Sequence, residues 1–314
     1  MGSRNHNSTE QVMEFILLGF QLPRPIEIFL FSVLLLVFLL TLAGNITIIV
    51  LVCLNQRLQT PMYFFLCNLS LLEILFILTI TPKMLVNLLS TDKTISFSGC
   101  IIQCYLYFFL GTTEFILIAV MSFDRYVAIC HPLRYTIIMN GHVCISLILG
   151  CWVGAFFSTI GPIFLFFRLS FCGSNIIDHF FCDYAPIIKL SCNDVQLLLT
   201  LESILSSVML IISLSVTADS YLYIIATILR MHSTSGQQKT FSTCASHIMV
   251  ASIFYGSTIF MYSLPSHGRS QDVQKAVAVL TAVVIPLLNP FIYTLRNEKV
   301  QEAFRDSLKR RTFS

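Results

Sequence analysis

The stretch that decides the fold is IEIFLFSVLLLVFLLTLAGNITIIVLVCL, which occupies residues 26–54. This apolar run exceeds the roughly 20 residues that a helix needs to cross a bilayer, and it is too long for the core of a signal peptide. The polar residues 1–25 before it lack a basic start and a small-residue cleavage site. We therefore expect a retained membrane-spanning helix that is preceded by a polar tail.

Six further apolar runs follow the first one. They cover residues 61–89, 98–130, 142–167, 196–230, 240–263 and 272–295. The composition agrees with a lipid environment, because 56% of the residues are hydrophobic and only 11% are charged, whereas a soluble domain carries about 25% charged residues. The sequence thus predicts an all-α membrane protein, a seven-transmembrane helix bundle over residues 26–295. Prolines inside these runs are expected to kink the helices rather than end them.

The last residues, 296–314, form a short amphipathic segment. Val300, Phe304 and Leu308 recur four residues apart, and charged residues fill the other faces. This pattern predicts a cytoplasmic amphipathic helix on the inner membrane surface, with a basic tail that favours anionic lipid headgroups. No stretch is left for a soluble catalytic domain, and a net charge of +3 with scattered basic residues argues against a nucleic-acid partner.

Three features favour an extracellular amino terminus. In that orientation eleven of the 19 Lys and Arg residues fall on the inner side, which is a modest bias. Asn7 begins an Asn-Ser-Thr acceptor for N-glycosylation, which requires the lumenal side. Four cysteines gather on the outer side, as an oxidising compartment allows, and their number permits three pairings. These cysteines are Cys100, Cys172, Cys182 and Cys192.

Six short motifs occur in order along the chain, each at a consistent membrane depth. They are Gly44-Asn45, LQTPMYFFL at 58–66, MSFDRYVAIC at 121–130, Ser220-Tyr221, KTFSTCASH at 239–247 and PLLNPFIY at 286–293. Over nearly the whole chain they resemble the odorant (olfactory) receptor family, tetrapod type, within the rhodopsin-like G-protein-coupled receptors. The sequence departs from the family pattern at Gln59, Ser122-Phe123 and Asp219. A carboxylate as deep as Asp219 is costly in lipid unless it is paired or wetted.

The resemblance implies a sensory receptor and not an enzyme. It implies that small, mostly apolar volatile odorants bind within the bundle, and that the receptor activates a stimulatory-type heterotrimeric G protein of olfactory neurons to raise cyclic AMP. The expected location is the plasma membrane of olfactory cilia, as a multi-pass protein. The resemblance also implies the disulfides Cys100–Cys182 and Cys172–Cys192, which would fold the second outer loop as a lid over the ligand.

A set of residues at the inner end of the bundle resembles the family's switch for G-protein coupling. At rest Arg125 would pair with Asp124, and it would turn to the G protein when the sixth helix swings outward. The simpler interpretation is that these charges only mark the membrane boundary. The residues that the resemblance assigns to coupling and activation are Asp124, Arg125, Tyr126, Tyr221, Lys239, His247, Asn289, Pro290 and Tyr293.

Glu73 and Glu114 lie deep within apolar runs, where each carboxyl must be neutralised by a proton, a partner or a cation. The resemblance places both near Asn45 and Asn289 at the centre of the bundle. We expect them to share a structural sodium ion or one proton, while no other cofactor is implied. The alternative is two protonated acids with purely structural hydrogen bonds.

The ligand-binding residues are predicted from helical spacing. Counted outward from Asp124, one face of the third helix carries five candidates, and the fifth and sixth helices carry comparable stripes. The full set is Tyr107, Phe108, Gly111, Thr112, Phe115, Leu205, Ser206, Met209, Tyr255, Thr258, Ile259 and Tyr262. Ordinary interhelical packing is the alternative for part of this set. A small apolar cavity suits a volatile odorant, and the third helix carries no Lys or carboxylate at the outer end of this face, which argues against a charged amine.

Rival functions make different predictions. A transporter or channel would show internal repeats or interrupted half-helices at mid-membrane, and no such repeat is evident. A receptor for a peptide or an amine is disfavoured by the long cysteine-rich outer loop. In that loop His179 and the cysteines are an alternative metal site, but disulfide-paired sulfur is a poor ligand. A cyclic AMP response to an odorant panel, set against ion flux in vesicles, separates the receptor from the transporter.

Overall fold

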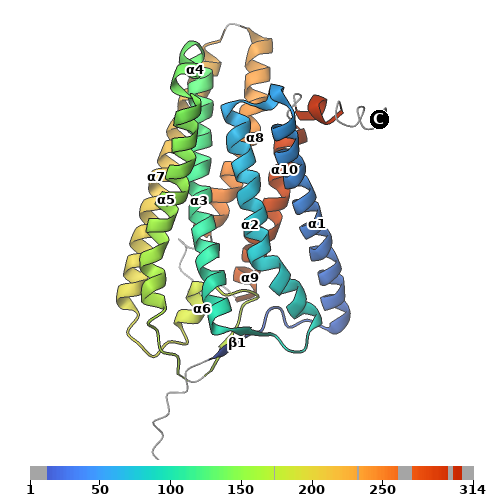
Figure 1. The fold of residues 1–314 in the computed structure, drawn as a ribbon, viewed down its shortest axis with the longest axis vertical. Helices are drawn as coiled ribbons and strands as arrows, with labels where there is room; N and C mark the ends of the chain where they lie inside the picture. The colour runs from blue at the N-terminus through green and yellow to red at the C-terminus, as the bar shows by residue number, and fades with distance from the viewer. Residues whose placement is uncertain (1–12, 173, 232, 261–270, 296–299, 306–314) are drawn as a thin grey trace, which may run out of the picture.

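The computed structural model describes residues 13–172, 174–231, 233–260, 271–295 and 300–305. Its long helices run side by side as an elongated bundle (Figure 1). They are α1 (Arg24–Leu54), α2 (Pro61–Leu89), α3 (Phe97–Cys130), α5 (Gly141–Phe166), α7 (Gln196–Leu229), α8 (Thr234–Thr258), α9 (Gln271–Val279) and α10 (Ile285–Leu295). The π-helical turn η4 (Leu280–Val284) joins α9 to α10, so that these three form one rod. Short helices are η1 (Gln56–Leu58), η2 (Pro132–Arg134), α4 (Tyr135–Ile138) and α6 (Tyr184–Ile188).

The seven-helix bundle that the sequence predicts is confirmed. Among the described residues, six helical stretches are long and apolar enough to cross a membrane, the last being Lys275–Ile292. The sixth rod, α8, is the most polar of the seven and runs within the same bundle (Figure 1). Large apolar side chains project outward from the rods, such as Phe29 at 69% exposure and Ile211 at 62%. Such a surface suits hydrocarbon rather than water.

The sixth and seventh helices differ in detail from the prediction. The sixth helix begins at Thr234 rather than at residue 240, and the end predicted at 263 lies outside the described residues. The seventh was predicted as one helix over 272–295 with kinks at its prolines, and the π-helical turn η4 lies just before Pro286. The π-helical turn is explained by Pro286, which comes just after η4. Proline has no amide hydrogen and cannot donate to the carbonyl four residues earlier, so the preceding turn widens.

A three-stranded sheet closes the outer end of the bundle, and the sequence did not predict it. β1 (Glu14–Leu17) lies between β2 (Thr94–Ser96), to which it is antiparallel, and β3 (Ile176–Ile177), to which it is parallel. The segment 1–25 was predicted as a polar tail, yet Phe15 and Leu17 are fully buried. Strands this short carry too few alternating residues to be recognised without their partners.

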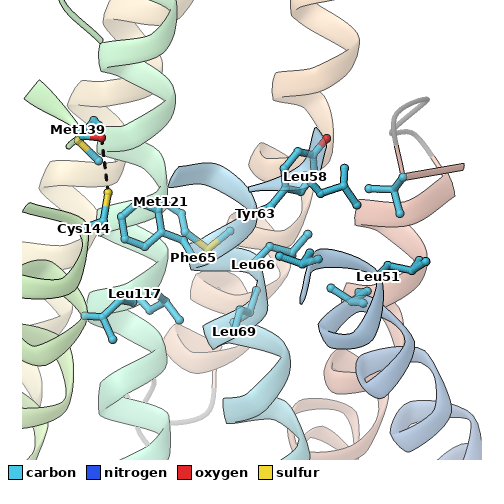
Figure 2. Packing of buried hydrophobic residues seen from close by; sticks show 14 of the residues in the cluster. Leu51, Leu58, Tyr63, Phe65, Leu66, Leu69, Leu117, Met121, Met139 and Cys144 are labelled. Atoms are coloured by element: carbon cyan, nitrogen blue, oxygen red, sulfur yellow. Dashed lines mark hydrogen bonds between the residues drawn. The ribbon is translucent and has the colours of Figure 1, made fainter. Parts of the chain in front are cut away.

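The packing between α1, α2, α3 and α5 holds the inner half of the bundle together. Figure 2 shows Phe65 of α2 reaching toward Met121 of α3, and both belong to one buried cluster with Leu51 of α1. Close approach between rods also matters. A Cβ added at Gly44 of α1 would lie 3.1 Å from the Pro290 Cβ of α10, so glycine lets the first and last rods touch.

The remaining charged residue of interest, Asp219, lies on the exposed face of α7, beside the buried Ser220. In the carboxy-terminal segment residues 300–305 are helical, with Val300 buried against the inner-half cluster and Phe304 45% exposed. Leu308, the third residue of the predicted apolar face, lies outside the described residues.

Candidate functional site

A cavity of about 600 Å³ opens between α3, α5, α6, α7 and α8 in the outer half of the bundle. All five residues predicted on the third helix line it, as do all three predicted on α7 and one, Thr258, on α8. Gly111 faces Phe76, whose ring would be 4.0 Å from an added Cβ. The predicted set that lines the cavity is Tyr107, Phe108, Gly111, Thr112, Phe115, Leu205, Ser206, Met209 and Thr258.

Two predicted ligand residues do not line this cavity. Tyr255 is buried, and its hydroxyl lies 3.2 Å from the Thr217 hydroxyl of α7, so it holds the two helices together instead. Ile259 falls in a π-helical stretch at residues 259–260, where the 3.6-residue spacing behind the prediction no longer applies. Tyr262 lies outside the described residues.

Acidic residues line the cavity, and the sequence analysis did not assign them to it. Asp183 comes from the loop before α6, Glu202 from α7, and Glu114 from α3. Asp183 is 6% exposed, and burial raises its pKa to about 6 although its carboxylate accepts a 2.7 Å hydrogen bond from the Tyr184 amide. One signal was present: Glu202 is an isolated acid in an apolar run, the same criterion that singled out Glu73 and Glu114.

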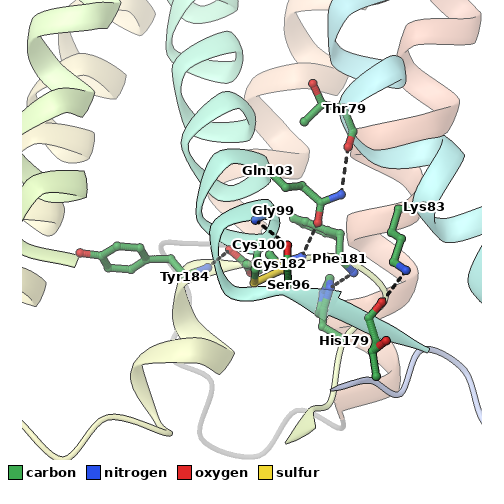
Figure 3. The surroundings of a disulfide bond; sticks show 12 residues. Thr79, Lys83, Ser96, Gly99, Cys100, Gln103, His179, Phe181, Cys182 and Tyr184 are labelled. Atoms are coloured by element: carbon green, nitrogen blue, oxygen red, sulfur yellow. Dashed lines mark hydrogen bonds between the residues drawn. A yellow bond between two sulfur atoms is a disulfide. The ribbon is translucent and has the colours of Figure 1, made fainter. Parts of the chain in front are cut away.

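Two disulfides hold the second outer loop over the cavity, with the pairing that the resemblance implied. Cys100 pairs with Cys182, and Cys172 pairs with Cys192. Figure 3 shows Gln103 of α3 next to the first bridge: its amide donates to the Thr79 carbonyl at 2.9 Å and its oxygen accepts from the Cys182 amide at 2.9 Å. One glutamine therefore fixes the lid to both α2 and α3.

Further contacts tie this lid to the last rod and to the amino-terminal segment. The Lys275 ammonium of α9 lies 2.5 Å from the Asp178 carboxylate and 3.0 Å from the Gly19 carbonyl. His179 is buried between Phe180 and Phe181, and burial lowers its pKa to about 4, so its ring is neutral at physiological pH. No group of three His, Cys, Asp or Glu side chains in the described part of the chain has a metal-binding arrangement.

The inner end of α3 carries the predicted switch. Asp124 is buried and paired with the Arg125 guanidinium, whose Nε lies 3.0 Å from the carboxylate. Tyr135 of α4 donates to the other Asp124 oxygen at 2.8 Å. Tyr126 lies 3.1 Å from His131, where the two rings meet edge to face.

The helices around this ion pair contribute the other predicted switch residues. Tyr221 of α7 packs with Cys244 of α8, and His247 is buried close enough to Arg125 for their charges to interact. Pro290 is buried in the last rod against Gly44. The side chains of Lys239 and Tyr293 lie outside the described residues, as does the whole of Asn7.

The carboxyl pair of Glu73 and Glu114 adjoins the cavity, because Glu114 is part of its lining. The Asn289 amide donates to Glu73 Oε1, and the Glu73 and Glu114 charges interact. Glu73 Oε2 and Glu114 Oε1 are buried and accept from no donor in the described part of the chain, while the two carboxyl groups lie within hydrogen-bonding reach of each other. Two orphaned carboxyl oxygens fit a shared cation or a shared proton, since either would satisfy them.

Asn45 was expected near this pair, and its side-chain amide faces α10, the helix that carries Asn289. It donates to the Thr41 carbonyl at 3.1 Å and to the Pro286 carbonyl at 3.5 Å. The Pro286 carbonyl lies four residues before Pro290, which has no amide hydrogen to give it. Asn45 therefore satisfies the carbonyl that the proline leaves free, as helices in lipid require.

Comparison with known proteins gives a consistent result over almost the whole chain. The family model described as "Olfactory receptor" matches residues 34–311. Human olfactory receptor 6J1 is 54% identical over 300 residues, covering 96% of this chain and 86% of that protein. Human olfactory receptor 6S1 is 50% identical over 98% of this chain and 93% of that protein. Mouse olfactory receptor 6E1 is 49% identical, covering 97% of each.

Proposed function

This chain belongs to the olfactory receptor family, and from this premise we propose that its cavity binds small, mostly apolar volatile molecules and that their binding activates a stimulatory-type G protein and raises cyclic AMP. Odorants and G proteins are the partners that the family as a whole implies. What we propose for this chain is the type of G protein and the use of the cavity as the odorant-binding site.

The observation that carries the proposal is the continuity of α3. One helix contributes Phe108 and Thr112 to the cavity wall, Glu114 to the buried carboxyl pair and Arg125 to the inner ion pair. A ligand that favours one packing of this helix therefore biases the Asp124–Arg125 pair. Its effect is limited by its differential affinity for the resting and active bundles.

We assign the switch roles on the same basis. Arg125 leaves Asp124 to engage the G protein, and Tyr126, Tyr221, Lys239, His247, Pro290 and Tyr293 shape or stabilise the opened inner end. The contacts of Arg125 with Asp124 and of Tyr135 with Asp124 support this assignment, because they describe a closed pair that opening would break.

We propose that the protein lies in the plasma membrane with its amino terminus outside. The two disulfides and β1 lie at the same end of the bundle, and disulfides persist in oxidising compartments. Glycosylation at Asn7 would follow from this orientation.

We further propose that Glu73 and Glu114 share a sodium ion or one proton, with Asn289 fixing Glu73. If the ion is sodium, replacing sodium chloride with choline chloride lowers the melting temperature of the purified receptor, and Glu114→Gln removes that difference. A melting temperature that ignores sodium in both proteins assigns the pair to a proton.

The test of the main proposal is the cyclic AMP response of cells that express the full chain to a panel of neutral and amine odorants. Thr112→Val should raise the half-maximal concentration of an active odorant severalfold, because Thr112 lines the cavity. Thr113→Val is the matched control, since the Thr113 hydroxyl donates to the Phe109 carbonyl at 2.8 Å instead of facing the cavity. Surface-expressed receptor that is silent to the panel, or that carries ion flux in vesicles, contradicts the proposal.

A further inference from the structure

The wall of the ligand cavity is acidic on one side. Asp183 and Glu202 both line it and lie close enough for their charges to interact. Glu114 adds a third carboxyl at the deep end. Among the described residues that line the cavity there is no lysine, arginine or histidine. The cavity therefore holds the Asp183 and Glu202 carboxyl groups without a Lys, Arg or His side chain in its described lining to pair with them.

The Tyr184 hydroxyl is a second, independent sign of a missing partner. Tyr184 lines the cavity next to Asp183, is 7% exposed, and its hydroxyl has no hydrogen-bond partner in the described part of the chain. Figure 3 shows its ring extending away from the Cys100–Cys182 bridge, and it stacks on Phe166 of α5 at 5.3 Å between centroids. A buried hydroxyl without a partner is costly, so a native fold usually provides one.

Resting on the proposed function, we propose that the ligand this cavity takes is an amine, whose ammonium group lies between Asp183 and Glu202 and donates to the Tyr184 hydroxyl oxygen. Charged hydrogen bonds from one ammonium satisfy both carboxylates and the tyrosine at once. The aromatic wall suits the same group, because the Phe108 and Tyr184 rings both line the cavity with their centroids 5.9 Å apart, and aromatic rings attract a nearby cation. The apolar remainder of the ligand lies along Phe115 and Met209.

The expectation against an amine rested on the long cysteine-rich outer loop and on the third helix, where no carboxylate occupies the outer end of the ligand face. The acids come from other parts of the chain. Asp183 is placed by the disulfide at the neighbouring Cys182, and Glu202 by the first turns of α7. Tertiary structure thus supplies a counter-charge that one helix could not show.

The experiment compares amines with alcohols of the same skeleton on the full-length receptor. The probes are three pairs: 2-phenylethylamine with 2-phenylethanol, cyclohexylamine with cyclohexanol, and hexylamine with hexanol. In the cyclic AMP assay we expect at least one amine to act at a tenfold lower concentration than its alcohol. Glu202→Gln and Asp183→Asn should each weaken that amine tenfold or more and change the alcohol less than threefold. Asp194→Asn is the matched control, because Asp194 is an exposed acid near the same helix end and does not line the cavity.

A second measurement separates this proposal from the function on which it rests. Thermal unfolding of the purified receptor reports binding without a G protein, and the preferred amine should raise the melting temperature of the native chain but not of Glu202→Gln. A receptor that answers to neutral odorants but prefers no amine in either assay overturns the amine proposal and leaves the odorant function standing. Stabilisation by an amine without any cyclic AMP response contradicts the proposed signalling and supports the amine site.

Discussion

Gln103 offers the sharpest test of how the lid is held. Its side chain bridges the Thr79 carbonyl and the Cys182 amide, each at 2.9 Å, and it is 6% exposed. Gln103→Leu keeps an apolar volume there but leaves the buried Cys182 amide without an acceptor. An orphaned buried donor costs about 1–3 kcal/mol. At about 2.1 cal/mol/K of unfolding entropy per residue, each kcal/mol lowers the melting temperature of this 314-residue chain by about 1.5 °C, so we expect a decrease of roughly 2–5 °C.

Gln103→Glu retains the bridge in its protonated form. A protonated carboxyl can accept from the Cys182 amide and donate to the Thr79 carbonyl, and burial favours this form over a carboxylate that would face the carbonyl oxygen. Thermal unfolding of purified receptor should therefore rank the native chain first, Gln103→Glu next and Gln103→Leu last. The leucine variant should also need a severalfold higher odorant concentration in the cyclic AMP assay. A leucine variant as stable as the native chain would refute the claim that this bridge positions the lid.

Three further predictions concern the pH response, the switch and the helix contact. Because the pKa of Asp183 is raised to about 6 from its ordinary 3.8, the folded state binds its proton more tightly, so stability increases as the pH falls through 6 toward 4, by at most roughly 3 kcal/mol. Melting temperatures at pH 7.4 and 5 should show about half of this gain without ligand, because pH 5 lies only one unit below the folded pKa. Asp183→Asn should reduce the gain, and an unchanged gain would exclude this carboxyl as its source. Tyr135→Phe removes the 2.8 Å hydrogen bond to Asp124, and a hydrogen bond to a charged group contributes about 1.5–3 kcal/mol. Basal cyclic AMP should therefore rise about tenfold at equal surface expression. Basal signalling at the native level would show that this contact does not hold the resting state. Gly44→Val places a side chain against a proline ring that already lies 3.1 Å from the position of an added Cβ, so surface expression should fall sharply, and normal expression would show that α1 and α10 separate at little cost.

The architecture was predictable because membrane helices satisfy their backbone hydrogen bonds within each segment. A run such as residues 26–54 can therefore be recognised as a membrane-spanning helix from its length and apolar composition alone. Phe108, Gly111 and Thr112 were correctly predicted to line the cavity. The prediction was possible because the spacing of side chains along one regular helix depends only on neighbouring residues. The same reasoning failed at Ile259, where the local helix type changed to a π-turn.

The chain alone determined that seven helices would lie in lipid and which face of α3 would meet the cavity, since both follow from the order of neighbouring residues. Only the folded arrangement decided what joins those helices at their outer end. β1 pairs with strands about 80 and 160 residues away, and Gln103 reaches a loop residue 79 positions on. The acidic wall formed by Asp183 and Glu202 has the same origin. Contacts between distant segments depend on how the rods pack and where the disulfides tether the loop, and no periodicity along the chain records them.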